Sequence, residues 1–518
     1  MAQTNNPFRI ISILAVFLAA LLLLGCNGNG PKTSPTPPTT PVLTPSETVS
    51  ATPATASSHQ QLKQSYAAFY SALEQKILTH DVDSILLAHD ELFAKVSQKK
   101  ISDDDAIKTL GGLTKQLENT APNSPSHLSS WKGKKIAVDE KHSYFGNWEM
   151  RPFFLSGERI WGINDFRKLF SSEKLLLSYE DITIQDNLGN LREMDAPSYT
   201  ESNGNFMPFP PVSLLVKSRL RMGVIPVIQL HLYDTNSETW FSGAGLKIEK
   251  QKQFGVSDVA DGKLDDYLKR QVKTFNAIDY PIILLFVNEF NTYSAFFFGK
   301  SGKEMYYDVE RQSGKEALFN QYGDPSIPDG PERIRDAWKK LRTIMDEQGA
   351  SSHISLASHA AGGHQNNAFR DANPNAPTPH LQDWNKMKHY WPGENVLDFV
   401  GMSAYGKELT LEKDSMSLYG SIYYWNEEIK SSAWSKTPLF YNEFSPLPDT
   451  KFQDTQPLNY IPEYITYSLG KIVPDYYPVS FVLFISPVNV RIDTSERISA
   501  FKKAVVDNSF YSDSVKLK

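Results

Sequence analysis

Eight short apolar runs alternate with longer amphipathic, charged segments between residue 134 and the C-terminus, and this alternation limits the possible folds more than any other feature. The clearest helical segments between the runs are 264–278 and 331–349, the second of which has Pro331 near its start and Gly349 at its end. Alternating strands and helices imply a parallel sheet. The candidate strands are residues 135–139, 174–180, 223–233, 281–290, 353–359, 396–406, 438–444 and 479–486.

Eight strand–helix units predict an α/β fold, the (β/α)8 TIM barrel, with long loops. An open, doubly wound sheet is the alternative. That alternative is disfavoured because neither a Gly-x-Gly-x-x-Gly motif nor a phosphate-binding loop follows any of the runs. We therefore interpret residues 131–518 as one barrel domain.

An apolar run from Ile10 to Leu24 follows Arg9 and ends in Leu-Leu-Gly-Cys at Cys26. The run is short for a membrane span and has the form of a secretion signal. It resembles a bacterial lipoprotein signal. The resemblance implies removal of residues 1–25, lipid (including palmitate) on Cys26, and anchoring at the cell surface or on the periplasmic side of a bacterial membrane. The alternative is an uncleaved signal anchor with an incidental cysteine. Since Cys26 is the only cysteine, an intramolecular disulfide is excluded.

Two further segments precede the barrel. Residues 26–57 are rich in Pro, Thr, Ser and Gly, which predicts an extended tether because such a chain buries too little apolar surface to fold. Residues 58–130 carry apolar side chains at spacings of three and four, which indicates helices; examples are Leu62, Tyr66, Phe69, Tyr70, Leu73 and Ile77. We expect a small helical bundle that packs on the barrel domain or acts as a spacer, with a binding role as the alternative.

The charge balance excludes one class of partner. The net charge is −6 and the pI about 6.0, without a long basic run. Nucleic-acid binding requires a concentrated basic surface, so we expect no nucleic-acid partner.

Two of the apolar runs end in the same three residues. "PIILLFVNEFN" contains Glu289 and "TPLFYNEFS" contains Glu443, each within Asn-Glu-Phe. In a TIM barrel the C-terminal strand ends form the active site, so both carboxylates would face one mouth. Paired carboxylates are the groups that glycoside hydrolysis uses, about 5–5.5 Å apart in retaining enzymes. The alternative for each glutamate is a structural carboxylate that pairs with an arginine or caps a helix.

Residues 134–490 resemble the clan A glycoside hydrolases, and in detail family 26, which includes β-mannanases. The similarity lies in the order and spacing of "GVIPVIQLHLY", "PIILLFVNEFNTYSAFFFG", "DAWKKLRTIMDEQGASSHISLASHA", "YWPGENVLDFVGMSAYG" and "KTPLFYNEFS". The resemblance implies that Glu289 is the general acid/base and Glu443 the nucleophile. It implies that Tyr405 hydrogen-bonds the nucleophile, with a half-buried strand-end aromatic as the alternative.

The remaining substrate-binding candidates are Asn288, His231 and Asn291. An amide at Asn288 can hydrogen-bond the sugar 2-hydroxyl, although the family usually has His there. The family's aromatic stretch after the acid is often Trp-rich, whereas this chain has three phenylalanines at 296–298. The eighth run ends "FISPV", without the tryptophan that many clan A enzymes place under the sugar. Trp148, Trp161, Trp240 and Trp391 are either replacement platforms or packing residues.

His359 and His364 follow the fifth run and also belong near the mouth, as contacts to sugar hydroxyls or as packing residues. No ligand set for a metal accompanies them, so we expect neither a metal nor a cofactor. The sequence thus predicts a monomeric, surface-anchored, retaining endo-β-glycosidase that hydrolyses a mannan-like or related β-linked polysaccharide. The alternatives are a non-catalytic glycan-binding surface lipoprotein and a solute-binding lipoprotein, which would have two similar lobes.

Overall fold

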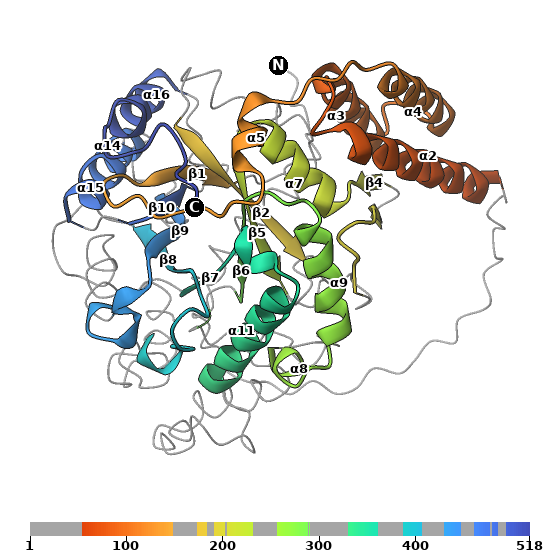
Figure 1. Ribbon diagram of the computed structural model, residues 1–518. Coiled ribbons are helices and arrows are strands. Elements are labelled where there is room, and N and C mark those ends of the chain that lie inside the picture. Colours follow the sequence, from red (N-terminus) through yellow and green to blue (C-terminus); the bar gives the residue numbers. More distant parts are fainter. Residues whose placement is uncertain are drawn as a thin grey trace, which may run out of the picture.

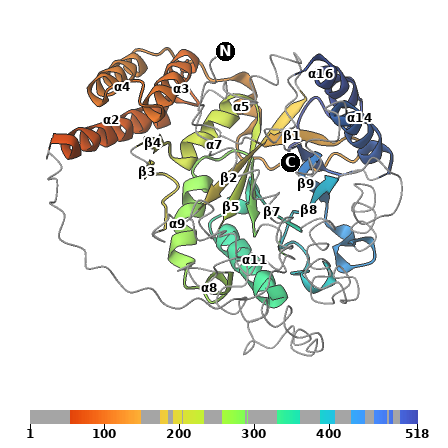
Figure 2. The same ribbon diagram turned by 180° about the vertical axis from the view of Figure 1, so that it is seen from behind.

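The computed structural model contains a closed barrel of parallel strands in the order β1-β10-β9-β8-β7-β6-β5-β2 (Figures 1 and 2). This confirms the predicted (β/α)8 barrel. The barrel strands are β1 (Tyr144–Trp148), β2 (Leu175–Thr183), β5 (Ile225–His231), β6 (Ile282–Phe286), β7 (Ile354–Ala360), β8 (Phe399–Gly406), β9 (Leu439–Pro446) and β10 (Phe481–Phe484). The structure describes residues 54–148, 174–183, 191–202, 205–231, 256–287, 290, 330–360, 387–406, 429–446, 460–476, 479–484 and 494–518.

Helices surround the strands (Figures 1 and 2). The two clearest helix predictions are confirmed by α9 (Asp265–Asn276) and α11 (Gly330–Glu347). In the described part of the chain, no helix combines the length and the apolar composition that a membrane span requires. The other helices beside the barrel are α5 (Ser126–Trp131), α7 (Val212–Arg221), α8 (Val256–Ala260), α14 (Tyr460–Tyr467), α15 (Val473–Tyr476) and α16 (Ser495–Phe501). Shorter 3-10 turns cover Ala350–Ser352, Met387–His389 and Ala433–Lys436, and π-helical turns cover Ser468–Ile472 and Lys502–Val506.

The first barrel strand differs from the prediction. Residues 135–139 form only an isolated antiparallel bridge, between Ile136 and Leu517, and the strand is instead β1. Its central residue, Gly146, lies where neighbouring strands approach closely. A Cβ atom there would be 2.6 Å from Leu483 Cδ2 and 2.7 Å from Leu177 Cβ. The glycine is needed for packing, but it also weakens the strand signal in the sequence.

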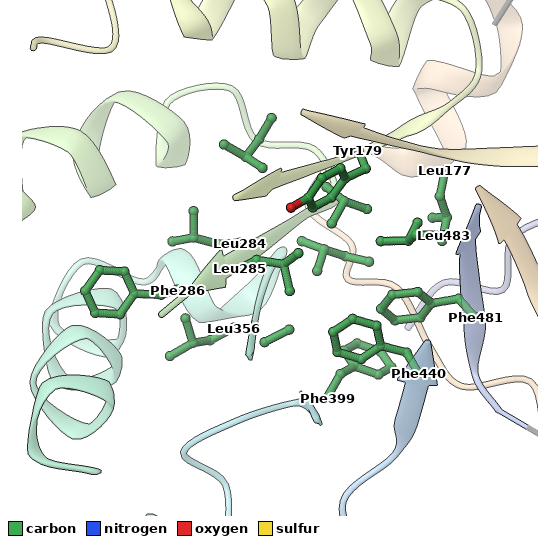
Figure 3. Close-up of a cluster of buried hydrophobic side chains, with 14 of the residues drawn as sticks. Leu177, Tyr179, Leu284, Leu285, Phe286, Leu356, Phe399, Phe440, Phe481 and Leu483 are labelled. Carbon is green, nitrogen blue, oxygen red and sulfur yellow. The ribbon is translucent and has the colours of Figure 1, made fainter. Parts of the chain in front are cut away.

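An aromatic cluster fills the barrel interior near the N-terminal strand ends. The ring of Phe440 stacks on Phe481 at 4.3 Å, and Phe399 meets Phe481 edge-on at 5.2 Å. Figure 3 shows these three rings gathered together, with Leu483 and Leu177 beyond them. The three rings thus close the barrel interior at this end.

A helical segment precedes the barrel, as predicted, and packs against its side. It consists of α2 (Ala54–Lys76), α3 (Asp83–Ser97) and α4 (Asp103–Glu118). The six apolar residues that indicated the first helix are all buried. They share a core with Phe206, Leu214 and Leu215 of the barrel domain. Phe206 belongs to an antiparallel hairpin that the sequence did not predict, β3 (Ser198–Ser202) with β4 (Asn205–Phe209).

Candidate active site at the C-terminal mouth of the barrel

Three of the candidate site residues fall near the C-terminal ends of barrel strands, where the mouth of a TIM barrel lies. Glu443 and Tyr405 lie in β9 and β8, and His231 is the last residue of β5; their side chains are outside the described part of the structure. The other candidates lie outside the described residues altogether: Asn288, Glu289, Asn291 and Cys26. The described parts of the site are the backbone of β8 and β9 and the neighbouring side chains.

A strained residue comes directly before the Asn288–Glu289 pair. Val287 follows the last residue of β6 and has φ +66°, although it is β-branched. Left-handed backbone is rare for such residues and costs about 1–3 kcal/mol, and it persists only where the surroundings enforce it. Val287 is buried, and its carbonyl accepts a hydrogen bond from Ser358 Oγ at 2.6 Å. The turn out of β6 is thus fixed to β7.

The residue after the pair is fixed to the same strand. The Phe290 amide donates to the His359 carbonyl at 3.1 Å. The Phe290 ring is fully buried against Trp338, Tyr390 and Trp434, with ring centroids 5.1, 5.0 and 6.4 Å away. Val287 and Phe290, the described residues on either side of positions 288 and 289 in the sequence, are therefore both anchored to the C-terminal end of β7.

The β9 strand has an irregularity at the second glutamate. Between β8 and β9, two register pairs flank it: Ser403 with Asn442, and Tyr405 with Ser445. Over this interval β8 advances by two residues and β9 by three. The extra residue is a β-bulge, which bends a strand and redirects a side chain, and such bulges are common beside active sites.

The pairing of β9 with β10 locates the extra residue. Tyr441 pairs with Val482 and Phe444 with Phe484, so that Leu483 alone lies opposite residues 442 and 443. The Tyr441 and Phe444 rings lie 5.8 Å apart on one side of the strand. In an undistorted strand, residues three apart would point to opposite faces. The bulge therefore contains the two positions before Phe444, the second of which is Glu443.

A histidine on β7 contacts the first residue of the bulge. The Asn442 amide nitrogen lies 3.2 Å from Nδ1 and 3.1 Å from Nε2 of His359. Both side chains are fully buried. The contact passes over β8, where the register partner of His359 is Gly401, which has no side chain. His359, which the sequence predicts near the mouth, lies near the C-terminal end of β7 as a buried link between strands. Asn442 was not among the candidate site residues, because one more polar residue beside a glutamate carries no distinct signal.

Two buried polar atoms near the bulge have no hydrogen-bond partner among the described residues. They are Oδ1 of Asn442 and Oγ of Ser403, and the two residues are register partners on neighbouring strands. A buried polar atom without a partner costs about 1–3 kcal/mol, and a ligand or an ordered water at the bulge would supply the missing partners.

A structural carboxylate on another strand provides a contrast. Glu180 of β2 is fully buried and pairs with Arg219 of α7, Oε1 to Nε at 2.6 Å. Burial raises the pKa of Glu180 and the adjacent guanidinium opposes that rise. Arginine pairing, the structural alternative considered for the two glutamates, is thus realised at Glu180, on the helix-facing side of the barrel.

The described side chains bear on two further expectations, the absence of a metal site and the tryptophans that could form a sugar platform. No group of three or more His, Cys, Asp or Glu within the described ranges could hold a metal ion. Trp391 packs against the main core. The side chain of Trp148, and residues Trp161 and Trp240, lie outside the described part of the structure.

No protein-family model and no curated protein matches the chain. Among solved structures, it is similar to a β-mannanase from a symbiotic protist of the termite Reticulitermes speratus, with 13% identity and a TM-score of 0.41 over 71% of this chain and 88% of that one. It is similar to an endo-β-1,4-mannanase from Cellulomonas fimi, with 13% identity and a TM-score of 0.40 over 74% and 73%. A fungal β-1,4-galactanase has 11% identity and a TM-score of 0.37 over 70% and 99%. At these values the similarities assign neither an activity nor a substrate to this chain.

Proposed function

We propose that this protein is a retaining endo-β-glycosidase that hydrolyses a β-linked polysaccharide, with Glu289 as general acid/base and Glu443 as nucleophile. One observation carries the proposal. Two backbone distortions lie at one end of a closed barrel: the left-handed Val287, two positions before Glu289 in the sequence, and the bulge of β9 that contains Glu443. Distortions at two strand ends are costly, and they coincide with the two carboxylates that glycoside hydrolysis requires.

In the proposed mechanism, Glu289 protonates the glycosidic oxygen while the Glu443 carboxylate attacks the anomeric carbon. Water then hydrolyses the glycosyl–enzyme ester, with Glu289 now acting as the base. The carboxyl groups must lie about 5–5.5 Å apart, in environments that keep one protonated and the other ionised. Asn288, Asn291 and His231 contact sugar hydroxyls, and Tyr405 hydrogen-bonds the nucleophile.

The proposed location is the outer side of a bacterial membrane. Lipid on Cys26 would hold the chain there as a monomer, with residues 26–57 as the tether. Labelling of the expressed protein with a radioactive fatty acid tests this part, since Cys26→Ser would abolish the label. Label retained in Cys26→Ser would exclude this anchor.

A non-catalytic glycan-binding lipoprotein is the second candidate. The sequence observation that favours it is the missing tryptophan after β10, where "FISPV" follows Val482 and Leu483. A binding protein needs the polar groups of the mouth but not two matched carboxylates.

Release of reducing sugar from a panel of β-mannans, β-galactans and β-glucans separates the two candidates. We expect Glu289→Gln and Glu443→Gln each to lower turnover by at least about 10³-fold, because each removes a group that acts on the reacting bond. Glu394→Gln is the matched control, since Glu394 is an exposed glutamate (67%) that pairs with Lys436. Binding without turnover by the unmutated protein would establish the second candidate, and full activity in either glutamine variant would remove the proposed mechanism.

A further inference from the structure

His359 is in contact with both glutamate-bearing segments. Its carbonyl accepts the hydrogen bond from the Phe290 amide, directly after Glu289. Its ring lies 3.1–3.2 Å from the amide nitrogen of Asn442, directly before Glu443. One residue of β7 therefore holds one segment by its main chain and the other by its side chain.

The surroundings of His359 leave its ring little freedom. The ring is fully buried, and the bond to Asn442 spans β8 at Gly401. Any side chain at 401 would meet the Phe440 ring, because a Cβ there would lie 2.4 Å from Phe440 Cζ. Because Gly401 has no side chain, the His359 ring can reach Asn442 across β8, and the Phe440 ring fills the space beside Gly401.

The chemistry of the contact indicates which substitutions at 359 can replace the histidine. The Asn442 amide nitrogen is a donor, so the ring nitrogen that receives its hydrogen bond must be unprotonated. A glutamine at 359 keeps an acceptor oxygen, whereas a phenylalanine of similar size keeps none.

We propose that His359 is a positioning residue that couples the two glutamate segments and so sets the separation of their carboxylates. This inference rests on the proposed function for its catalytic meaning, while the coupling itself is a property of the fold. Displacement by about 1 Å at a reacting group can lower turnover about 10²-fold, so a shared anchor for both segments bears directly on rate.

Hydrogen exchange of the full chain tests the coupling without reference to activity. His359→Phe removes the side-chain contact to Asn442 and keeps the main-chain bond to Phe290. We expect exchange to accelerate about five- to thirtyfold at the amides of 443–445, the effect of losing about one hydrogen bond, and also to accelerate at the Phe290 amide because the displaced β7 carries its acceptor. Asn442→Leu breaks the contact from the other side and should also accelerate exchange at Phe290. His359→Gln should restore most of the protection. Unchanged exchange at Phe290 in Asn442→Leu would overturn the coupling.

His353→Phe is the matched control. His353 is also buried, and it directly precedes the N-terminal end of the same strand. We expect it to leave exchange at both glutamate segments unchanged. Equal acceleration in the control would show a general loosening of β7 and would overturn a specific role of His359. If His359→Phe does not fold, Asn442→Leu and His359→Gln decide the question.

Kinetics then connect the coupling to the reaction. We expect kcat to fall about 10²-fold in His359→Phe with KM nearly unchanged, and His359→Gln to recover most of kcat. An inactive unmutated protein that shows the expected exchange pattern would refute the proposed function and leave the coupling intact. An active protein with unchanged exchange in both variants would refute the coupling alone.

Discussion

Single glycines determine how closely the barrel strands and their side chains can pack. Gly401 is the clearest case, since the Phe440 ring occupies the space that a side chain at 401 would need. The same absence of a side chain lets His359 reach Asn442 across β8. Both the packing of the barrel interior and the contact between His359 and Asn442 therefore depend on the absence of a Cβ atom at Gly401.

Replacing Gly401 with alanine should destabilise the protein. The new methyl group must displace the Phe440 ring within a stacked cluster, and overpacking of a core costs about 1–3 kcal/mol in the free energy of unfolding. Urea unfolding measures this loss. Gly112→Ala in α4 is the control, because a Cβ there meets no atom within 4 Å and alanine favours a helix. A Gly401→Ala protein as stable as the control would show that the ring moves without cost.

Among the secondary-structure elements, the carboxylate of Asp398 joins α11, β7 and the segment that contains Lys135. Asp398, just before β8, accepts hydrogen bonds from Lys135 Nζ at 2.6 Å, from Arg342 Nη2 of α11 at 2.6 Å, and from the Leu356 amide of β7 at 2.8 Å. Burial alone would raise the pKa of Asp398, but the two cations and their hydrogen bonds outweigh it and hold the pKa below its usual value.

This pKa shift predicts that acid lowers the stability that Asp398 contributes at the N-terminal end of the barrel. A carboxyl group whose pKa is depressed in the folded state stabilises the protein above its unfolded pKa of about 3.9, and the stabilisation is lost as the pH falls through the folded value. Asp398→Asn should therefore be less stable than the unmutated protein at pH 7, and the difference should shrink below about pH 4. Urea unfolding at both pH values measures it. The exposed Asp336→Asn serves as the control, since its contact to Lys339 is 3.9 Å long and mostly solvated. A pH-independent difference for Asp398→Asn would contradict the assignment.

The sequence predicted most barrel strands because those strands are buried on both faces and appear as continuous apolar runs. The strand β1 was missed, since Gly146 and Asn147 interrupt its apolar pattern. The bulge in β9 was also invisible. A bulge is defined by how a strand pairs with its neighbours, and the sequence of β9 alone does not determine that pairing. The strain at Val287 was hidden for a similar reason, because valine is an ordinary strand residue and only the surrounding contacts impose its left-handed backbone.

In the whole molecule, the helical segment packs its apolar side chains against Phe206, Leu214 and Leu215 of the barrel domain, in a cluster distinct from the main barrel core. Polar contacts add to it: Arg221 of α7 donates to Asp83 Oδ1 at 2.7 Å and to the carbonyls of Ile77 and His80 at 3.1 and 2.7 Å. Tyr70 of α2 donates to the carbonyl of Pro208 at 3.0 Å. Of the two structural roles expected for this segment, packing on the barrel is what the structure shows.

The apolar cluster between the helical segment and the barrel domain predicts that the two unfold together. Arg221→Ala should lower the stability of the whole protein by about 1.5–3 kcal/mol, because it leaves carbonyls without a charged donor. Tryptophan fluorescence reports on the barrel domain, since residues 54–118 contain no tryptophan, and hydrogen exchange reports on α2 to α4. Arg270→Ala is the control, as its pair with Glu193 is exposed. Earlier unfolding of α2 to α4 than of the barrel would show two independent units.

The bulge in β9 has a consequence for descent. It exists because β9 carries one residue more than β8 and β10 over the same interval. In a gene, that surplus is one codon, and a replacement of one amino acid by another leaves the codon in place. A descendant that exchanged Glu443 for another residue would lose the carboxylate and still inherit the bulge. The register of β9 would therefore mark the position of this site in a descendant that no longer has the glutamate.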